Sequence, residues 1–314
     1  MTGNRFVGLL TGLIITMIIQ SSGATTVMVV TFVNAGLLPL AQSVGVIFGA
    51  NIGTTITAWI VSIFGFNFKI SAIAVPILGF GYFFSIFKKG AYKNIAEAIM
   101  GFALLFIGLS GLSDLFTDPD KFLWLGPIQS WGAGSIILGF IIGIFFTALL
   151  HSSSAFSAIV IALAYNGIVN WEFAAALTLG SNIGSTIDAV LAAAGTSPDA
   201  KRSALIHVFF NVFGTMIALI LFKPFLSLVT ACTPGGANGN IAIRISMMHT
   251  VFKTISAIIF LPLVNPLVKL SRLCIKDKPQ DNSGVYILEF HDMSRKERLT
   301  AHIMTAEKAI ADMT

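Results

Sequence analysis

The order of apolar and polar positions along the chain predicts membrane helices, some of them too short to cross a bilayer. Residues 6–19 and 24–38 are apolar runs of 14 and 15 residues, separated by Gln20-Ser21-Ser22-Gly23. A crossing helix needs about 20 apolar residues for a hydrocarbon core of about 30 Å. We therefore predict a re-entrant helical hairpin whose polar tip lies inside the membrane. One long helix with a polar middle fits the same pattern.

The same pattern returns in the second half of the chain. Residues 136–150 and 155–169 are apolar runs on either side of His151-Ser152-Ser153-Ser154. Three longer apolar segments follow each hairpin, and each is a predicted membrane span. They are 43–65, 70–87 and 95–112 after the first hairpin, and 174–195, 203–222 and 245–262 after the second.

A gap-free alignment of each residue n with residue n+131 indicates an internal duplication. Between positions 20 and 58, 12 of 39 residues are identical to their counterparts. The identities include Ser21-Ser22 with Ser152-Ser153, so they go beyond chance matches between apolar helices. A hairpin that returns to its own side adds no crossing, so three spans per repeat make the second repeat inverted. We predict repeats over 1–131 and 132–268, and a cytoplasmic charged tail over 269–314.

Composition strengthens the membrane assignment. The chain is 55% hydrophobic and 11% charged, whereas soluble domains carry about 25% charged residues. Of the 33 charged residues, 15 lie after position 268. The main body is therefore predicted to be neither a soluble enzyme, nor a nucleic-acid binder, nor a disordered chain. The expected fold class is an all-α polytopic membrane protein with two inverted-topology repeats.

Basic residues are divided unequally between the two sides that these spans define. Eight fall on one side, namely Arg5, Lys88, Lys89, Lys93, Lys201, Arg202, Lys269 and Arg272. Four fall on the other, namely Lys69, Lys121, Lys223 and Arg244. Cytoplasmic loops carry the excess of Lys and Arg, which predicts a multi-pass plasma-membrane protein with both termini in the cytoplasm. The two hairpins then enter from opposite sides, and their tips can meet near the midplane.

The hairpin tips are rich in hydroxyl groups at the new ends of broken helices. Exposed helix N-termini attract anions, exposed carbonyls coordinate small cations, and serine hydroxyls add rotatable donors. These donors fit an oxyanion, although a carbohydrate or an amide would also fit them. The first tip also carries Thr25 and Thr26, and the second carries Ser157.

A second polar cluster follows each hairpin at matched positions. It comprises Asn51, Thr54, Thr55 and Thr57 in the first repeat, and Asn182, Ser185, Thr186 and Asp188 in the second. Neutral oxygens of this kind suit sodium, and they lack the several carboxylates expected of a calcium site. Helix packing uses the same small polar residues and remains the alternative for any single serine or threonine.

Asp188 lies well inside an apolar segment, where a carboxylate is costly and is therefore a functional candidate. We interpret it as a cation ligand or coupling residue. The alternative is a structural ion pair with Lys253. Both Lys253 and Arg244 are expected near the ends of the last span, where long basic side chains reach the interface.

At these residues the chain resembles the type II sodium/phosphate cotransporter family, as a bacterial member. That family carries a Gln-Ser-Ser-Ser motif and a Gly-x-Asn-Ile-Gly-Thr-Thr motif in each of two inverted repeats. Here the motifs read QSSGATT (20–26) with GANIGTT (49–55), and HSSSAFS (151–157) with GSNIGST (180–186). The resemblance covers roughly residues 6–265, through HVFFN at 207–211, and implies sodium-driven import of inorganic phosphate.

The resemblance also implies where the substrate and ions bind. We predict phosphate ligands at Gln20, Ser21, Ser22, Gly23, His151, Ser152, Ser153 and Ser154. We predict sodium ligands at Thr25, Thr26, Asn51, Thr54, Thr55, Thr57, Ser157, Asn182, Ser185, Thr186 and Asp188. The expected partners are inorganic phosphate, sodium ions and the lipid bilayer, with no nucleic acid and no cofactor besides the coupling ion.

Three positions depart from the family pattern. Gly23 replaces the third serine, His151 replaces glutamine, and Asp188 replaces what is more often a neutral hydroxyl residue. The last departure leaves the number of coupled sodium ions open. The alternatives to a phosphate symporter are a sodium-coupled carrier of sulfate or a dicarboxylate, a passive anion channel, and a membrane sensor. Whether the chain forms a homodimer, and whether its tail begins a PhoU-like domain, also stays open.

Overall fold

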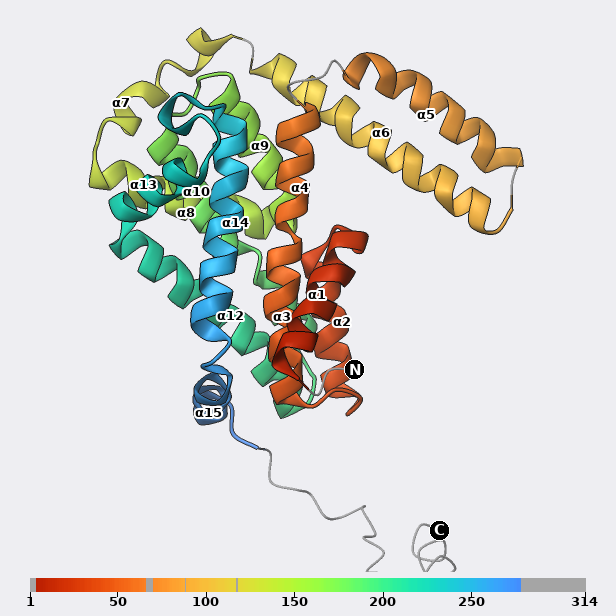
Figure 1. Cartoon of the computed structure of the whole chain (residues 1–314), viewed down its shortest axis with the longest axis vertical. Helices are drawn as coiled ribbons and strands as arrows, with labels where there is room; N and C mark the ends of the chain where they lie inside the picture. The colour runs from red at the N-terminus through yellow and green to blue at the C-terminus, as the bar shows by residue number, and fades with distance from the viewer. Residues whose placement is uncertain (1–3, 66–69, 88, 117, 278–314) are drawn as a thin grey trace, which may run out of the picture. The chain divides into compact units, whose positions relative to one another are not determined.

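The computed structural model describes residues 4–65, 70–87, 89–116 and 118–277, and all regular structure in these ranges is helical. The first half contains α1 (Arg5–Ile19), α2 (Ser22–Asn34), α3 (Leu40–Gly53), α4 (Thr55–Ile60), a π-helical turn (Val61–Gly65), α5 (Ile70–Phe87) and α6 (Ala91–Leu115). A linking segment contains a 3-10 turn (Pro119–Phe122) and α7 (Leu125–Gln129). The second half contains α8 (Ala133–Leu150), α9 (Ser153–Tyr165), α10 (Trp171–Gly184), α11 (Ile187–Ala192), α12 (Pro198–Ile220), α13 (Phe222–Cys232), a 3-10 turn (Gly236–Asn238), α14 (Ile241–Phe260) and α15 (Val264–Cys274). The predicted all-α fold is confirmed (Figure 1).

Both predicted hairpins are present as pairs of short helices, so a single long helix with a polar middle is wrong. α1 and α2 separate at Gln20-Ser21, and α8 and α9 separate at His151-Ser152. α1, α2 and α9 have 15, 13 and 13 residues, about 20 Å at 1.5 Å per residue. α8 has 18 residues because it begins at Ala133, so the prediction that each arm is too short fails for this arm.

Each predicted span is helical, and two contain helix breaks that the hydropathy pattern did not reveal. Four of the six, 43–65, 95–112, 203–222 and 245–262, correspond to described stretches long and apolar enough to cross a membrane. The first span divides at Thr54 into α3 and α4, and the corresponding second-repeat span divides at Ser185-Thr186 into α10 and α11. The predicted span 203–222 corresponds to α12, which ends at Ile220, and α13 starts directly after it at Phe222.

The duplication is visible in how each hairpin packs on the helix that follows it. α1 lies against α3 and α8 lies against α10, and glycines make both contacts. A Cβ on Gly12 would overlap the carbonyl of Val46, and a Cβ on its counterpart Gly143 would overlap the carbonyl of Leu177. Small residues let helix backbones approach closely. Residues 131 positions apart therefore make equivalent packing contacts in the two repeats. The inverted orientation of the second repeat stays a prediction.

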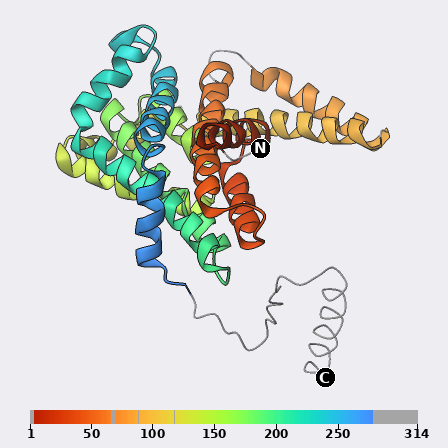
Figure 2. The same ribbon diagram turned by 60° about the horizontal axis from the view of Figure 1, so that its bottom comes forward.

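The central helix of the unit Met1–Lys276 is α14. It contacts α3 and α4 of the first half and α9, α10, α12 and α13 of the second half (Figures 1 and 2). Ser246 donates to the carbonyl of Ala58 at 2.8 Å, and Trp59 donates to Thr250 at 2.9 Å, which fixes α14 on α4. α14 therefore packs between helices of both halves of the chain.

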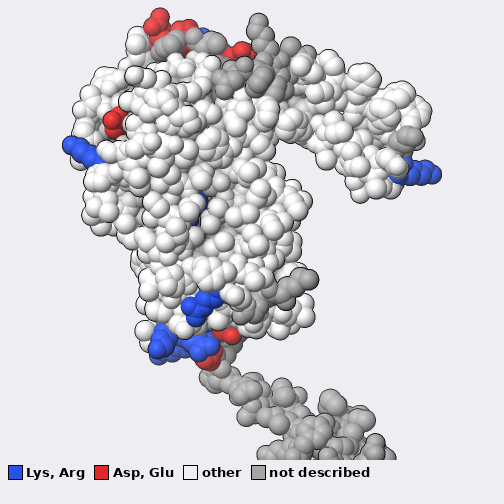
Figure 3. Space-filling model, in the orientation of Figure 1, with Lys and Arg blue, Asp and Glu red and all other residues white. Residues whose placement is uncertain are grey.

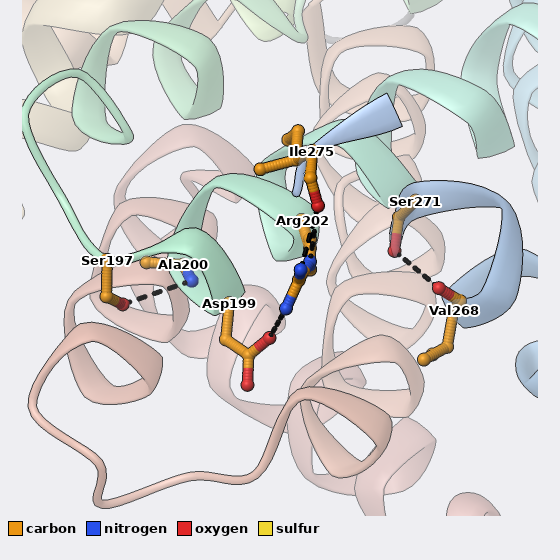
Figure 4. A network of polar contacts seen from close by, with 7 residues as sticks. All are labelled: Ser197, Asp199, Ala200, Arg202, Val268, Ser271 and Ile275. Carbon is orange, nitrogen blue, oxygen red and sulfur yellow. Dashed lines mark hydrogen bonds and ion pairs between the residues drawn. The ribbon is translucent and has the colours of Figure 1, made fainter. Parts of the chain in front are cut away.

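An arginine joins the start of α12 to the end of α15. The Arg202 guanidinium donates to the carbonyl of Ile275 at 2.8 and 3.0 Å and to Asp199 at 2.6 Å (Figure 4). Ser197 caps the first turn of α12 by accepting from Ala200. The side chain of Arg202 is buried, so these bonds satisfy its charge and order the chain as far as residue 275.

The surface agrees with a lipid environment. Charged side chains lie mostly at the ends of the helices and leave most of the face shown in Figure 3 without charge. Many large apolar side chains are exposed, especially on α5, α6 and α8. Five helical stretches in the described residues are long and apolar enough to cross a membrane: Leu40–Gly65, Ala91–Gly111, Ala133–Leu150, Pro198–Ile220 and Ile241–Phe260. Of the predicted charged tail over 269–314, the part from residue 278 onward lies outside the described residues.

Candidate functional site: two hairpin tips that line one cavity

The two hairpin tips have the same backbone geometry. Gln20 and His151 have φ values of 58° and 51° and are the only non-glycine residues with positive φ in the described part of the chain. Left-handed backbone costs a non-glycine residue about 1–2 kcal/mol. Ser21 and Ser152 then cap the second helix of each hairpin, and each hydroxyl oxygen accepts from the N–H three residues later at 3.1 Å. This paired strain directs the first N–H groups of α2 and α9 into the same region.

All eight predicted phosphate residues line a single cavity of about 100 Å³, which we call the tip cavity. Ser22 and Gly23 belong to the first turn of α2, and Ser153 and Ser154 belong to the first turn of α9. Two further residues complete the lining, Ser185 and Asp188. The predicted meeting of the two tips is therefore confirmed as a local arrangement, while their depth in a bilayer stays a prediction.

Each tip residue is held by a partner from its own repeat, at equivalent positions. Thr57 donates to the amide oxygen of Gln20 at 2.7 Å, and Nδ1 of His151 lies 2.7 Å from the carboxylate of Asp188. Residue 151 is the counterpart of residue 20, and residue 188 is the counterpart of residue 57. The first repeat thus uses a neutral pair where the second uses an ionisable pair. The Asp188 side chain is 20% exposed and that of His151 is 52% exposed.

The unusual residues Gly23 and Asp188 contact each other across the repeats. A Cβ added to Gly23 would lie 2.6 Å from Oδ2 of Asp188, so a serine at position 23 would collide with this carboxylate. The departures at 23, 151 and 188 are therefore linked in space, because the carboxylate that bonds His151 also occupies the space that a side chain at position 23 would need. The sequence alone did not connect them.

A second cavity of about 20 Å³ lies next to the first, and we call it the inner cavity. Its size corresponds to about one water-sized species. It shares Ser22, Ser153, Ser154 and Ser185 with the tip cavity. The remaining lining comprises Asn51, Thr54, Thr55, Thr57, Ala58, Ser157, Asn182, His249 and Lys253. Most predicted sodium residues of both repeats therefore meet in one place.

Lys253 and His249 were not among the predicted site residues. Lys253 is 5% exposed, so its predicted position near a span end is wrong: it lies at the middle of α14. Its ammonium donates to Asn51 at 2.8 Å and to Asn211 at 2.9 Å. The alternative ion pair with Asp188 is also wrong, because Asp188 bonds His151 instead. Nε2 of His249 lies 3.1 Å from the hydroxyl of Ser157.

Arg244 is likewise buried rather than extended to the interface. It contacts the backbone carbonyls of Gly236, Ala237 and Gly239 near the start of α14. Its guanidinium also lies 5.5 Å from the ring centre of Trp171. Arg244 therefore stabilises the turn before α14 and has no contact with either cavity.

Three predicted sodium residues line neither cavity. Thr25 is buried and bonds Thr16 and the carbonyl of Ser21, both at 3.0 Å. Thr186 donates to the carbonyl of Ile183 at 2.8 Å. Thr26 is fully buried, and its hydroxyl has no partner in the structure. The sodium-ligand role of these three residues stays a prediction.

The geometry of the tip cavity suits an oxyanion that is bound together with a cation. Two helix N-termini and several serine hydroxyls supply donors from both repeats. The carboxylate of Asp188 repels an anion in the same cavity unless a cation binds together with that anion. The neutral oxygens of the inner cavity are of the type that binds sodium.

Comparison with known proteins agrees with this geometry. The sequence profile of the Na⁺/Pi-cotransporter family matches residues 1–114 and 130–257 of the chain. The chain belongs to the Na⁺/Pi-cotransporter family. This is a family of transporters, and its match together with the several apolar helices indicates a multi-pass membrane protein. No solved structure matches it.

Three relatives show how far the similarity extends. The uncharacterized protein YqeW of Bacillus subtilis (strain 168) is 33% identical over 230 residues, which cover 70% of this chain and 69% of YqeW. YjbB of Escherichia coli (strain K12), to which inorganic phosphate export is provisionally assigned, is 28% identical over 219 residues, 69% of this chain and 39% of YjbB. Sodium-dependent phosphate transport protein 2C of Rattus norvegicus is 44% identical over 84 residues, 26% of this chain and 14% of that protein.

Proposed function

We propose that this Na⁺/Pi-cotransporter family member is a symporter that binds inorganic phosphate between its two hairpin tips and couples phosphate movement to sodium. The observation that carries the proposal is the tip cavity, in which all eight predicted phosphate residues come together from both repeats. A site built from two hairpins of opposite repeats suits alternating access, in which one repeat moves against the other around bound substrate.

Phosphate would be held by hydrogen bonds from the serine hydroxyls and from the N–H groups at the start of α2 and α9. Ser22, Ser153 and Ser154 supply hydroxyls that line both cavities. The hydroxyl oxygens of Ser21 and Ser152 accept hydrogen bonds from N–H groups of their own helices. Their hydroxyl protons can therefore be donated to the substrate. Helix N-termini add a favourable field for an anion.

Sodium coupling would arise from Asp188 and the inner cavity. A carboxylate in a cavity meant for phosphate repels the substrate in a low-dielectric bundle. A sodium ion bound beside Asp188, or among the neutral oxygens of Asn182, Ser185 and Ser157, offsets this repulsion. Phosphate then binds well only when sodium is present, which is the requirement for symport.

The direction of transport follows the gradients in a symporter. An inward sodium gradient gives phosphate import, with both termini placed in the cytoplasm of a plasma membrane. Export is the second candidate, because the relative YjbB carries a provisional assignment to phosphate export. A carrier for sulfate or a dicarboxylate and a passive anion channel are the remaining outcomes.

The test is uptake of ³²P-phosphate into proteoliposomes that contain the purified full chain. We expect an inward sodium gradient to drive uptake above the equilibrium level, and an equal potassium gradient to drive none. Arsenate should compete and sulfate should not. Vesicles loaded with phosphate test export under the opposite gradient. Uptake that ignores sodium would contradict coupling, and equal competition by sulfate would contradict phosphate as the substrate.

A matched pair of variants tests whether the measured uptake depends on the serines of the hairpin tips. The double variant Ser22→Ala with Ser153→Ala removes one donor from each tip and should abolish sodium-driven uptake. Ser85→Ala, on α5 and outside both cavities, serves as the control and should transport normally. Equal transport by the two proteins would place the substrate elsewhere.

A further inference from the structure

The ammonium of Lys253 lies where the amide oxygen of Asn51 could otherwise bind a cation. This ammonium lines the inner cavity and donates to Oδ1 of Asn51 at 2.8 Å and to Oδ1 of Asn211 at 2.9 Å. In the described residues, no carboxylate forms an ion pair with Lys253. The charge is therefore surrounded by neutral oxygens, which is the ligand type that sodium prefers.

The two amide groups are oriented independently of the lysine. Nδ2 of Asn51 donates to the carbonyl of Ile47 at 3.0 Å, and Nδ2 of Asn211 donates to the carbonyl of His207 at 3.0 Å. Each amide oxygen is consequently turned toward the same point, where the ammonium lies. Two amide oxygens that converge on one point form part of a cation site with or without a lysine.

The second repeat contains the matching asparagine without a lysine. Asn182 is the counterpart of Asn51, and its Nδ2 donates to the carbonyl of Thr178 at 3.1 Å, the same four-residue spacing as Asn51. Asn182 also lines the inner cavity. Among the described residues, no lysine or arginine bonds to Asn182. The two repeats thus present similar asparagines, of which one bonds an ammonium.

The sequence around Lys253 repeats a pattern found on the neighbouring helix. α12 carries His207-Val-Phe-Phe-Asn211, and α14 carries His249-Thr-Val-Phe-Lys253. The histidine and the final residue of each motif are buried, as are Phe210 and Phe252. Lysine therefore stands where the sister motif has an amide, and it brings a covalently attached positive charge into the centre of the bundle.

We propose that the ammonium of Lys253 occupies the cation position of the first repeat and replaces one sodium ion there. Sodium that moves with the substrate then binds on the side of Asn182 and Asp188. The inference deepens the proposed sodium coupling and rests on it for its link to transport. It assigns this chain one sodium ion fewer than the same chain with asparagine at position 253.

The test counts bound sodium ions directly, without phosphate or transport. Purified full-length protein is titrated with ²²Na⁺ in detergent, and saturation binding is compared between the wild type and Lys253→Asn. We expect one additional sodium ion per chain in the variant. In proteoliposomes the ratio of ²²Na⁺ to ³²P-phosphate taken up should also rise by one. Lys223→Asn, at an exposed lysine of α13, is the control and should leave the count unchanged.

The outcomes separate this inference from the proposed function. Equal, non-zero sodium counts in the wild type and Lys253→Asn would overturn the lysine inference alone. No sodium in the wild type and one ion in the variant would support the inference and overturn sodium coupling of the natural chain. No sodium in either protein would overturn both.

A second comparison decides the question if Lys253→Asn does not fold. In the wild type, Asn182→Ala should raise the sodium concentration for half-saturation at least tenfold more than Asn51→Ala does, because Asn51 bonds the lysine. Equal shifts in sodium half-saturation for the two alanine variants would overturn the inference. Size-exclusion chromatography verifies that each variant is folded before it is titrated.

Discussion

The contact between Gly23 and Asp188 leads to a sharp prediction about a single added side chain. Gly23→Ser restores the hydroxyl that the family motif carries, yet its Cβ would lie 2.6 Å from Oδ2 of Asp188. The carboxylate must then shift, and we expect this shift to disrupt its 2.7 Å contact with His151. We expect Gly23→Ser to impair phosphate uptake although it adds a donor.

The magnitude follows from the contact that is broken. A hydrogen bond to a charged group contributes about 1.5–3 kcal/mol, and solvent screening at the half-exposed His151 lowers this to about 1–1.5 kcal/mol. The phosphate concentration for half-maximal uptake should therefore rise about 5- to 13-fold. Asp188→Thr, which removes the carboxylate, should also impair uptake because His151 loses its partner.

The double variant Gly23→Ser with Asp188→Thr gives the decisive comparison. The collision disappears, and the pair of residues returns to the family pattern. The fold-increase in half-maximal phosphate concentration for the double variant should be smaller than the product of the fold-increases for the two single variants. The difference should correspond to a coupling energy of about 1 kcal/mol. ³²P uptake at saturating sodium measures all four proteins. Gly101→Ser is the control, since a Cβ there has no atom within 4 Å. Strictly additive single effects, or wild-type behaviour of Gly23→Ser, would refute the coupling between positions 23 and 188.

Three further predictions concern the tips, the ion and the fold. Ser22→Ala and Ser153→Ala should each raise the half-maximal phosphate concentration roughly 5- to 150-fold, from a lost buried donor of about 1–3 kcal/mol; uptake kinetics measure this, and two unaffected variants would make these serines packing residues. Asp188→Asn should shift the sodium activation curve more than it shifts phosphate affinity at saturating sodium; a folded variant with an unaltered sodium curve would exclude Asp188 from coupling. Gly180→Ala should lower the unfolding temperature in detergent, because its Cβ overlaps the backbone carbonyl of Phe140 and overpacking costs about 1–3 kcal/mol; a melting curve like that of Gly101→Ala would contradict the close helix approach.

The hairpins could be predicted from sequence because two independent signals coincide at Gln20 and His151. A polar break interrupts each apolar run, and the n+131 alignment places the two breaks at equivalent positions. Helix breaks inside longer apolar spans carry no such signal. The divisions of α3 from α4 at Thr54 and of α10 from α11 at Ser185-Thr186 depend on local backbone geometry that hydropathy does not report.

Contacts between particular side chains were the part that sequence could not supply. The alignment equates residue 57 with residue 188, but it does not show that each bonds its own hairpin tip. Lys253 was misplaced because a lysine was expected to reach the interface, although the predicted span 245–262 is centred on it. The structure buries it at the middle of α14, where the amide oxygens of Asn51 and Asn211 accept from its ammonium. The sequence signal that indicates the buried position of Lys253 is the similarity of HVFFN (207–211) and HTVFK (249–253), which makes position 253 the equivalent of Asn211.

The central claim is that one anion binds between the two hairpin tips, and an anomalous-scattering experiment tests it most directly. The purified protein is crystallised with sodium and arsenate, a tetrahedral analogue of phosphate whose arsenic atom gives its own anomalous signal. The account predicts one arsenic peak in the tip cavity, within hydrogen-bonding distance of Ser22 or Gly23 of one tip and Ser153 or Ser154 of the other. A peak that contacts only one tip, or that lies outside this cavity, would contradict it.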